Sequence, residues 1–447
     1  MENTPSSTTV PERWAPPFFT IWAGQAFSLI GSALVQFALV WWMTSQTGSA
    51  TVLATATLFA LLPQIILGPF VGTLVDRWNR RLIMIVADSG IALATGVLIY
   101  LFATGQVQVW HVYVILLIRS LGGAFHGPAM TASTSLMVPP QHLARLAGLN
   151  QTLQGLISIF APPLGALLIG LLPLEGVLAI DIATAALAVL PLLFIPIPRP
   201  PRQTALDNGT AVKTSYWQDL AQGFRYVTKW PGLLGLILMA MLLNFLLVPS
   251  SSFMPLVVTQ IFNKGVVELG WTETLFGVGM IVGGVALGAW GGFKRKIITS
   301  LSGVLGISLG VILIGVAPGN MFFLLLVANF ILGMTQVFAN GPLGAIFQST
   351  IEHDMQGRVF SLINAGATAM MPLSLMVAGP MSDWLGIRIW YLIGGGLCIL
   401  VTIIAFLTPA IITIEEQRKA DAPTQPANPD TQIRPVDPDS TTGLNQP

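Results

Sequence analysis

The feature that most constrains this chain is a series of twelve long apolar stretches. An α-helix needs about 20 apolar residues to cross the hydrocarbon core of a bilayer, where its own hydrogen bonds have to satisfy the backbone. Only 9% of the 447 residues are charged, whereas soluble domains have about 25%. The sequence therefore predicts an all-α polytopic membrane protein, with spans at residues 17–43, 50–75, 82–104, 109–138, 147–172, 176–197, 231–258, 271–293, 297–317, 320–346, 359–381 and 387–412.

A polar break at residues 198–230 divides the spans into two groups of six, at 17–197 and 231–412. The break starts as a Pro-rich linker and then places apolar residues on one helical face. This pattern predicts an amphipathic helix on the cytoplasmic membrane surface, and a loosely structured connector is the alternative. The polar segments 1–16 and 413–447 are predicted to be cytoplasmic tails, the second of them disordered because it is rich in Pro.

The beginnings of the fifth and eleventh spans resemble each other. In each, a His precedes an Arg (Arg145 or Arg358), and an Asn (Asn150 or Asn364) follows one to two turns later. Because the similar segments lie six spans apart, they predict two pseudo-symmetric six-helix bundles, an arrangement typical of secondary transporters.

The distribution of basic residues predicts the orientation of the chain. If the N-terminus is cytoplasmic, nearly all Lys and Arg lie in cytoplasmic loops and tails, and only Lys264 and Arg388 lie in loops on the other side. Such a bias is typical of membrane proteins with both termini inside the cell. We therefore expect a multi-pass protein of the plasma membrane (a bacterial inner membrane) with the lipid bilayer as its solvent. The net charge of +1 gives no indication of nucleic acid binding.

Charges are concentrated in the segment "GTLVDRWNRR", residues 72–81, between the second and third spans. This segment resembles the signature that the major facilitator superfamily carries at the same place. The resemblance implies that Asp76 meets the positive N-terminus of the eleventh span while the cytoplasmic side is closed, and that Gly72 allows close helix approach. The predicted conformational latch consists of Gly72, Asp76, Arg77, Arg80, Arg81 and Arg358.

An alternative interpretation of this cluster is that its arginines only fix the membrane topology. Membrane topology depends on Lys and Arg and does not require the carboxylate of Asp76, so the presence of Asp76 favours the latch. A related Gly-three-Asp pattern occurs in "GPMSDWLG" at Asp383, on the opposite side of the membrane, where it is compatible with a small outer clamp.

Arg119 is the clearest charge inside a span, and at that depth it needs an acceptor or a water-filled cavity. Counting residues from the membrane surface puts Asp181, in the sixth span, within about 8 Å of the same level. We predict that Arg119 and Asp181 form a proton-responsive pair. A static pair that holds the first bundle together is equally consistent with the sequence.

Three further titratable residues lie within or near the spans. Asp88 could pair with Arg80 or Arg81, and His126 could relay protons or line a cavity as a hydrogen-bonding group. Glu273 lies at the start of the predicted eighth span. The residues assigned to proton coupling are Asp181, Arg119, Asp88 and His126.

Amides and aromatic residues within the spans predict a mainly apolar cavity with scattered hydrogen-bonding groups. Such a surface suits a large amphiphilic organic molecule better than a sugar or an inorganic ion. A bend in the fifth span, at Pro162, Pro163 and Gly165, would shape this cavity. The predicted cavity residues are Trp22, Gln25, Gln36, Asn150, Gln154, Asn244, Phe245, Gln336, Asn340 and Asn364.

The sequence contains no phosphate-binding loop, zinc ligand set or acyl-transfer motif. We therefore expect no enzyme activity, no cofactor and no metal, and an ion gradient as the energy source. The segments "IRSLGGAFHGPAM", "LAIDIATA" and "GRVFSL" are similar to those of the macrolide-efflux branch of the drug:proton antiporters. The resemblance implies a monomer that exports a small hydrophobic compound in exchange for protons. A siderophore or lysolipid exporter and a non-transporting sensor or scaffold are the alternatives.

Overall fold

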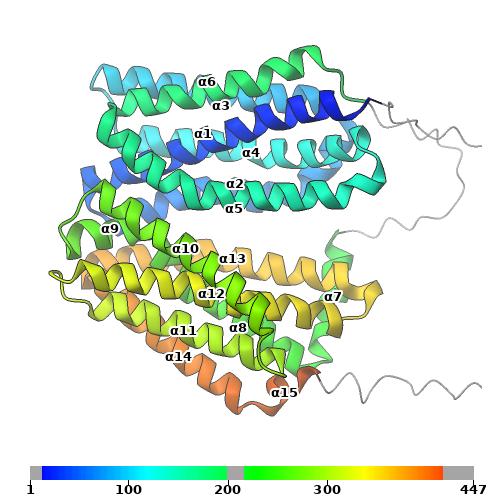
Figure 1. Cartoon of the computed structure of the whole chain (residues 1–447), viewed down its shortest axis with the longest axis vertical. Coiled ribbons are helices and arrows are strands. Elements are labelled where there is room, and N and C mark those ends of the chain that lie inside the picture. The colour runs from blue at the N-terminus through cyan, green and yellow to red at the C-terminus, as the bar shows by residue number, and fades with distance from the viewer. Residues whose placement is uncertain (1–12, 199–215, 416–447) are drawn as a thin grey trace, which may run out of the picture.

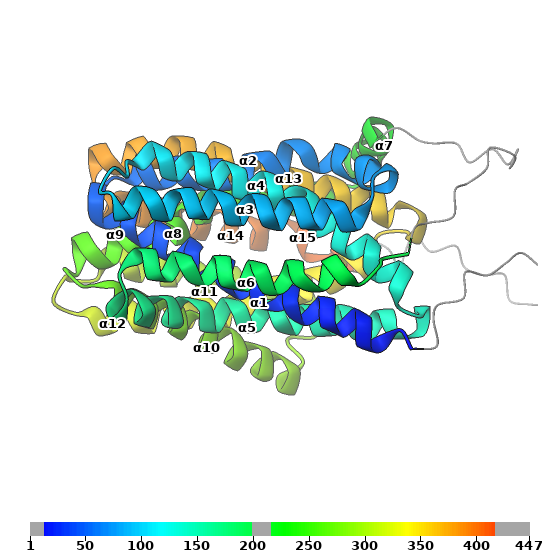
Figure 2. The same ribbon diagram turned by 90° about the horizontal axis from the view of Figure 1, so that it is seen from above.

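The structure, a computed structural model, describes residues 13–198 and 216–415. These described residues form helices and no strands, and twelve of the helices are long and apolar enough to cross a membrane. The prediction of an all-α polytopic fold is therefore confirmed. The helices run roughly parallel to one another (Figures 1 and 2), and in Figure 1 they form two groups that lie side by side.

The first group contains the six long helices of the N-terminal half, and its short loops make consecutive helices antiparallel. Helix starts and ends carry the expected signals: the Ser49 hydroxyl caps α2, the Asn79 side chain caps α3, and Gly48 ends α1 with φ of +60°. The helices are α1 (Ala15–Thr47), α2 (Ala50–Arg77), α3 (Arg80–Ala103), α4 (Val109–Met137), α5 (Pro140–Leu171) and α6 (Leu174–Phe194).

The second group contains the six long helices of the C-terminal half and three short pieces. The short pieces are α9 (Met254–Leu256), the π-helical turn η1 (Val257–Ile261) and α15 (Pro409–Ile412). The long helices are α8 (Pro231–Ser252), α10 (Val266–Trp290), α11 (Lys296–Val316), α12 (Phe322–Thr350), α13 (His353–Leu385) and α14 (Ile387–Leu407).

Some predicted boundaries are wrong. The seventh span was expected to be one helix over 231–258, but α8 ends at Ser252 and the chain continues through α9 and η1. Helices α5 and α13 begin about two turns before the predicted spans, because a polar sequence can extend a helix beyond the hydrocarbon region that hydropathy detects. For the same reason α10 begins at Val266, so Glu273 lies two turns inside the helix rather than at its start.

The two ends of the molecule are named here by their loops. The basic end carries the loops at 78–79, 138–139 and 291–295, and the far end carries those at 48–49, 104–108 and 386. The linker helix α7 (Tyr216–Thr228) lies at the basic end, on the right in Figure 1. Its Gly223 and Val227 are buried. Gly223 lies so close to α13 that a Cβ atom placed on it would be 3.0 Å from the Arg358 carbonyl oxygen. Helix α7 therefore packs against the start of α13.

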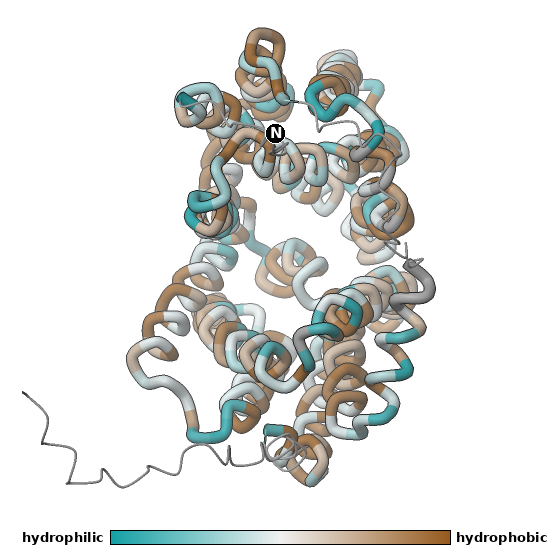
Figure 3. Tube along the Cα trace, turned by 90° about the vertical axis from the view of Figure 1, so that its right-hand side faces the viewer, coloured by the Kyte–Doolittle hydropathy of each residue, from teal (hydrophilic) through white to brown (hydrophobic). Residues whose placement is uncertain are grey.

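The two groups contact each other mainly at the far end, where α13 packs along α2 and α10 along α5. A Cβ at Gly379 would lie 3.0 Å from the Ala54 Cβ atom, and one at Gly270 would lie 2.8 Å from the Ala166 Cβ atom. Toward the basic end, Gly72 and Gly284 have nothing within 4 Å of the Cβ position. Figure 3 looks along the helices from the basic end, with one group above the other.

Candidate functional site

A buried ion pair lies at the centre of the first group. The Arg119 guanidinium donates to Asp181 at 2.5 Å and to the Thr95 hydroxyl at 3.1 Å. Asp181 also accepts from the Thr95 and Ser32 hydroxyls, at 3.1 and 3.2 Å. The contact predicted from helix depth is therefore present, and it joins α1, α3, α4 and α6.

Burial differs between the two partners of this pair. The Asp181 side chain is 1% exposed and the Arg119 side chain 10% exposed. A carboxylate with a cation and two hydroxyl donors is electrostatically satisfied even in a low-dielectric interior. The arrangement suits a brace between helices, and its role in proton coupling stays a prediction.

Asp88 does not meet Arg80 or Arg81, and that prediction is wrong. The Asp88 carboxylate accepts a hydrogen bond from Gln25 at 3.1 Å, and its other oxygen lies 3.5 Å from His126 Nε2. The two arginines instead reach backbone carbonyl groups: Arg80 donates to Ala132 at 3.0 Å, and Arg81 donates to Leu193 at 2.6 Å. Asp88 lies two turns deeper in α3, and the long arginine side chains extend toward the polar end of the bundle.

A polar cavity of about 240 Å³ lies between α1, α2, α3 and α4. We call it the N-cavity. Five of the predicted site residues line it, and so do Gln64 and Ser120, which the sequence did not indicate. Its polar side chains include those of Gln25, Gln36, Gln64, Asp88, Arg119 and His126.

A second cavity, of about 370 Å³, lies within the C-terminal group, and we call it the C-cavity. Three predicted amides line it: Asn244, Gln336 and Asn340. Most of the remaining wall is aliphatic, and Glu273 and Tyr391 are the titratable residues among its lining. The C-cavity thus matches the predicted surface of apolar walls with scattered hydrogen-bonding groups.

Several predicted cavity residues lie outside both cavities but are exposed within the spans. Gln154 and Asn364 are exposed, and so is Asn150, whose amide oxygen accepts a 2.8 Å hydrogen bond from the Trp22 indole. Exposed amides facing lipid would leave hydrogen-bonding groups unsatisfied. Water in a space between the two groups would satisfy them, and their role as cavity residues stays a prediction. Phe245 packs near Trp390, with ring centroids 6.4 Å apart, and lines neither cavity.

The proline pair of α5 lies at the junction of the two groups. Helix α5 continues without interruption through Pro162 and Pro163. A Cβ at Gly270 of α10 would lie 3.4 Å from the Pro163 Cα atom, and one at Gly165 would lie 2.8 Å from the Phe37 ring. Pro162 and Pro163 therefore form part of the far-end contact between α5 and α10, whereas Gly165 packs against α1.

A carboxylate of the second group caps a helix of the first group at the far end. Asp383 of α13 accepts hydrogen bonds from the Ser49 hydroxyl at 2.7 Å and from the backbone N–H groups of Ala50 and Thr51 at 2.6 and 3.0 Å. A helix N-terminus offers unpaired N–H groups and a positive dipole end, both of which favour an anion. The clamp suggested by the Gly-three-Asp pattern is thus a contact between the two groups.

The predicted latch lies at the opposite, basic end. The side chain of Asp76 lies outside the described part of the structure, and Arg77 is exposed. Nothing lies within 4 Å of a Cβ placed at Gly72. Arg358 lies in the second turn of α13, where α7 packs against its backbone.

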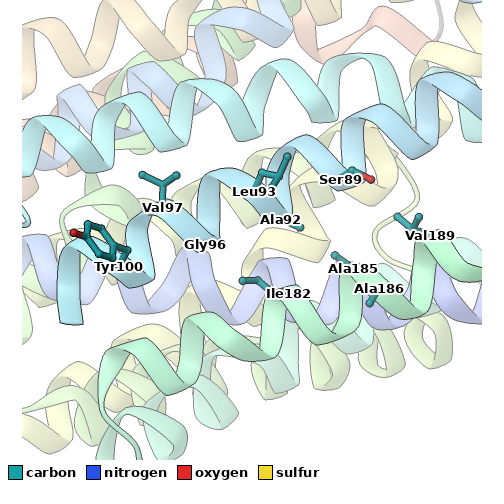
Figure 4. A pocket seen from close by; sticks show the side chains of 10 residues that line it. All are labelled: Ser89, Ala92, Leu93, Gly96, Val97, Tyr100, Ile182, Ala185, Ala186 and Val189. Atoms are coloured by element: carbon teal, nitrogen blue, oxygen red, sulfur yellow. The ribbon is translucent and has the colours of Figure 1, made fainter. Parts of the chain in front are cut away.

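Two larger grooves on the outside of the first group are apolar. One, of about 740 Å³, runs between α3 and α6, and Figure 4 labels the residues that line it. Only Ser89 and Tyr100 among them carry polar groups, while Leu93 is 73% exposed. The other, of about 570 Å³, lies between α3 and α4. Such surfaces suit lipid acyl chains, and they lack the convergent polar groups of a substrate site.

The comparisons with known proteins agree with this architecture. A sequence profile described as Major Facilitator Superfamily matches residues 21–365 and 233–436. Macrolide efflux protein A of Streptococcus pyogenes is 35% identical over 408 residues, which cover 91% of this chain and 98% of that protein. The multidrug efflux pump Tap of Mycobacterium bovis is 25% identical over 422 residues, 91% of this chain and 96% of the pump.

A solved structure has the same fold. It is a bacterial homologue of the human lysosomal transporter Spinster, crystallised in an inward-facing and unoccupied conformation. The TM-score is 0.64 at 15% sequence identity, and the match covers 90% of this chain and 98% of that one.

Proposed function

This chain belongs to the major facilitator superfamily, and we propose that it exports macrolide-like, hydrophobic or amphiphilic organic compounds across the plasma membrane. Similarity over nearly the full length of a macrolide efflux protein and of a multidrug efflux pump supports drug efflux. It favours this function over siderophore or lysolipid export and over a sensor or scaffold. The apolar walls and isolated amides of the C-cavity suit such compounds.

Transport by alternating access is supported by one observation above all: the two groups pack together at the far end and stand apart at the basic end. The concentration of Lys and Arg at the basic end supports a cytoplasmic location for that end and for both termini. With the basic end in the cytoplasm, the structure is open at its cytoplasmic end, and a drug enters the space between the groups from inside the cell. Closing the basic end and opening the far end would then release it outside.

The latch at residues 72–81 would hold the basic end closed during the other half of the cycle. The open space beside Gly72 leaves room for another helix to approach. In the closed state Asp76 would cap the N-terminus of α13 near Arg358, as Asp383 caps α2 at the far end in this structure. Arg80 and Arg81 anchor the first turn of α3 on carbonyl groups of α4 and α6, which keeps the loop in place.

Proton exchange would supply the energy, and Asp88 is the acid best placed for it. Asp88 lines the N-cavity beside Gln25 and His126, so a proton arriving by water can reach it. Asp181 is 1% exposed and fully paired with Arg119. We therefore assign the exchanged proton to Asp88 and His126, and to Arg119 and Asp181 the task of holding the cavity wall in shape.

Drug uptake into inside-out membrane vesicles tests this function. A proton gradient with an acidic vesicle lumen should drive accumulation of radiolabelled erythromycin, because protons leave the lumen in exchange for the drug, and a protonophore should abolish it. Asp88→Asn should make any remaining erythromycin flux insensitive to the gradient. Glu175→Gln is the matched control, since it removes a carboxylate in the first turn of α6, away from both cavities. Accumulation that ignores the protonophore would contradict proton exchange, and no accumulation at all would contradict macrolide export.

A further inference from the structure

Glu273 places a carboxyl group in the wall of the C-cavity. It lies two turns inside α10, about 10 Å below the far end of that helix at 1.5 Å per residue. The C-cavity has room for a sizeable chemical group, and typical ligand pockets begin at about 300 Å³. The amides Asn244 and Gln336 share this wall, together with aliphatic side chains such as Leu243 and Leu332.

The carboxylate of Glu273 is uncompensated by the protein. Within residues 13–198 and 216–415, no hydrogen bond or ion pair joins it to a donor, and the other titratable residue of the cavity wall, Tyr391, donates its hydroxyl to the Ser250 carbonyl. Asp181, the buried carboxylate of the first group, has Arg119 at 2.5 Å. An unpaired carboxylate inside a membrane protein is costly and marks a site for a counter-charge.

We propose that Glu273 binds the protonated amine of an amphiphilic organic substrate, which fixes the position of that substrate in the C-cavity. The inference rests on the proposed function, because it concerns the compound that is exported. An organic cation fits better than a metal ion, since the described residues contain no group of three or more metal-ligating side chains. The ammonium group would lie at the carboxylate, Asn244 or Gln336 would accept or donate hydrogen bonds, and the apolar part would lie along the aliphatic wall.

The amine should account for a large share of the binding selectivity. A charge-assisted hydrogen bond in a water-poor cavity is stronger than a neutral one. Removing the charge of Glu273 should therefore weaken binding of a cationic compound by about tenfold or more, while an uncharged compound of the same shape should bind as before.

The test measures binding to the full chain in lipid nanodiscs by scintillation proximity. The probes are erythromycin, which carries a tertiary amine, and its N-demethyl-N-acetyl derivative, which is uncharged. Glu273→Gln should weaken erythromycin binding about tenfold and leave the derivative unaffected, and Glu273→Asp should restore part of the erythromycin affinity. Glu268→Gln is the matched control: it lies on the same helix, outside the cavity, and its glutamine can still cap Gly265.

Two outcomes would overturn the proposal: an equal loss of affinity for both probes, which means a structural role, or no loss for either. Failure of the proposed function would be recognised differently, because the unmodified chain would then neither bind nor move erythromycin. A lipophilic tertiary amine unrelated to macrolides, such as verapamil, tests Glu273 in that case as well. Glu273→Gln should reduce its binding by a similar factor, and unchanged binding would overturn the proposal.

Discussion

Asp383 of α13 accepts a 2.6 Å hydrogen bond from the backbone N–H of Ala50, at the start of α2. The two residues belong to different helix groups, so the contact joins the groups at the far end. Gly379 and Asp383 have the same spacing as Gly72 and Asp76. The same pattern therefore occurs at opposite ends of a packed pair of helices, α2 and α13, which supports a pair of reciprocal clamps.

Removing the far-end clamp should favour the conformation that is open at the far end. Asp383→Ala removes the acceptor of three hydrogen bonds at a helix N-terminus, a change that costs about 1–2 kcal/mol for a helix cap. The population ratio of the two conformations should shift about tenfold. Spin labels at the exposed positions Gln106 and Asn320, in far-end loops of the two groups, would report this as a longer distance. An unchanged distance distribution would show that the hydrogen bonds do not hold the groups together.

Asp76→Asn should shift the same equilibrium in the opposite direction. Without the carboxylate, the closed basic end loses its electrostatic attraction to the N-terminus of α13, so the far-end-closed population should rise. Membrane insertion should stay normal, because the arginines that set topology remain, but erythromycin transport should fall to background. Combining Asp76→Asn with Asp383→Ala should return the label distances toward those of the unmodified chain. Full transport by Asp76→Asn would refute the latch.

Much of the fold could be predicted because the bilayer restricts it. Apolar runs of span length and the distribution of basic residues determine which segments cross and in which order. The break after α8 could not be predicted in this way, since α9 and the first residues of η1 are apolar as well. Helix starts such as that of α5 lie outside the apolar run, where only capping and packing define them.

The candidate site was partly predictable for a related reason. Depth along a helix is fixed by the rise per residue, and it correctly placed Arg119 beside Asp181. Rotation about the helix axis is fixed by packing, which explains why Asp88 turned out to contact Gln25 rather than an arginine. The hydroxyl groups of Ser32 and Thr95 were missed because small polar residues are common in membrane helices and carry no signal by themselves.

The Arg119–Asp181 pair should stabilise the first group of helices. The stability lost on breaking the pair should depend on which charge remains buried. Asp181→Asn leaves Arg119 buried without a counter-charge, so the protein should lose about 3 kcal/mol of stability, measured as a lower midpoint of thermal unfolding in detergent. The double variant Arg119→Met with Asp181→Leu should recover most of this stability, because neither charge remains. If the double variant still transports drug in response to a proton gradient, the pair has a structural role. If the double variant is stable but its transport no longer responds to the gradient, Asp181 carries the exchanged proton.

The close approach of α10 to α5 should be needed for closure of the far end. A Cβ at Gly270 would lie 2.8 Å from the Ala166 Cβ atom, and the wall on that side is formed by Pro163, whose backbone cannot easily shift. Gly270→Leu should therefore push the two groups apart at the far end, since overpacking of a close contact costs about 1–3 kcal/mol. Gly284→Leu is the control on the same helix, because nothing lies within 4 Å of its Cβ position. Cysteines introduced at the far end should react with a membrane-impermeant maleimide faster in Gly270→Leu than in Gly284→Leu. Equal reaction rates would mean that the far end closes through other contacts, such as the cap that Asp383 places on α2.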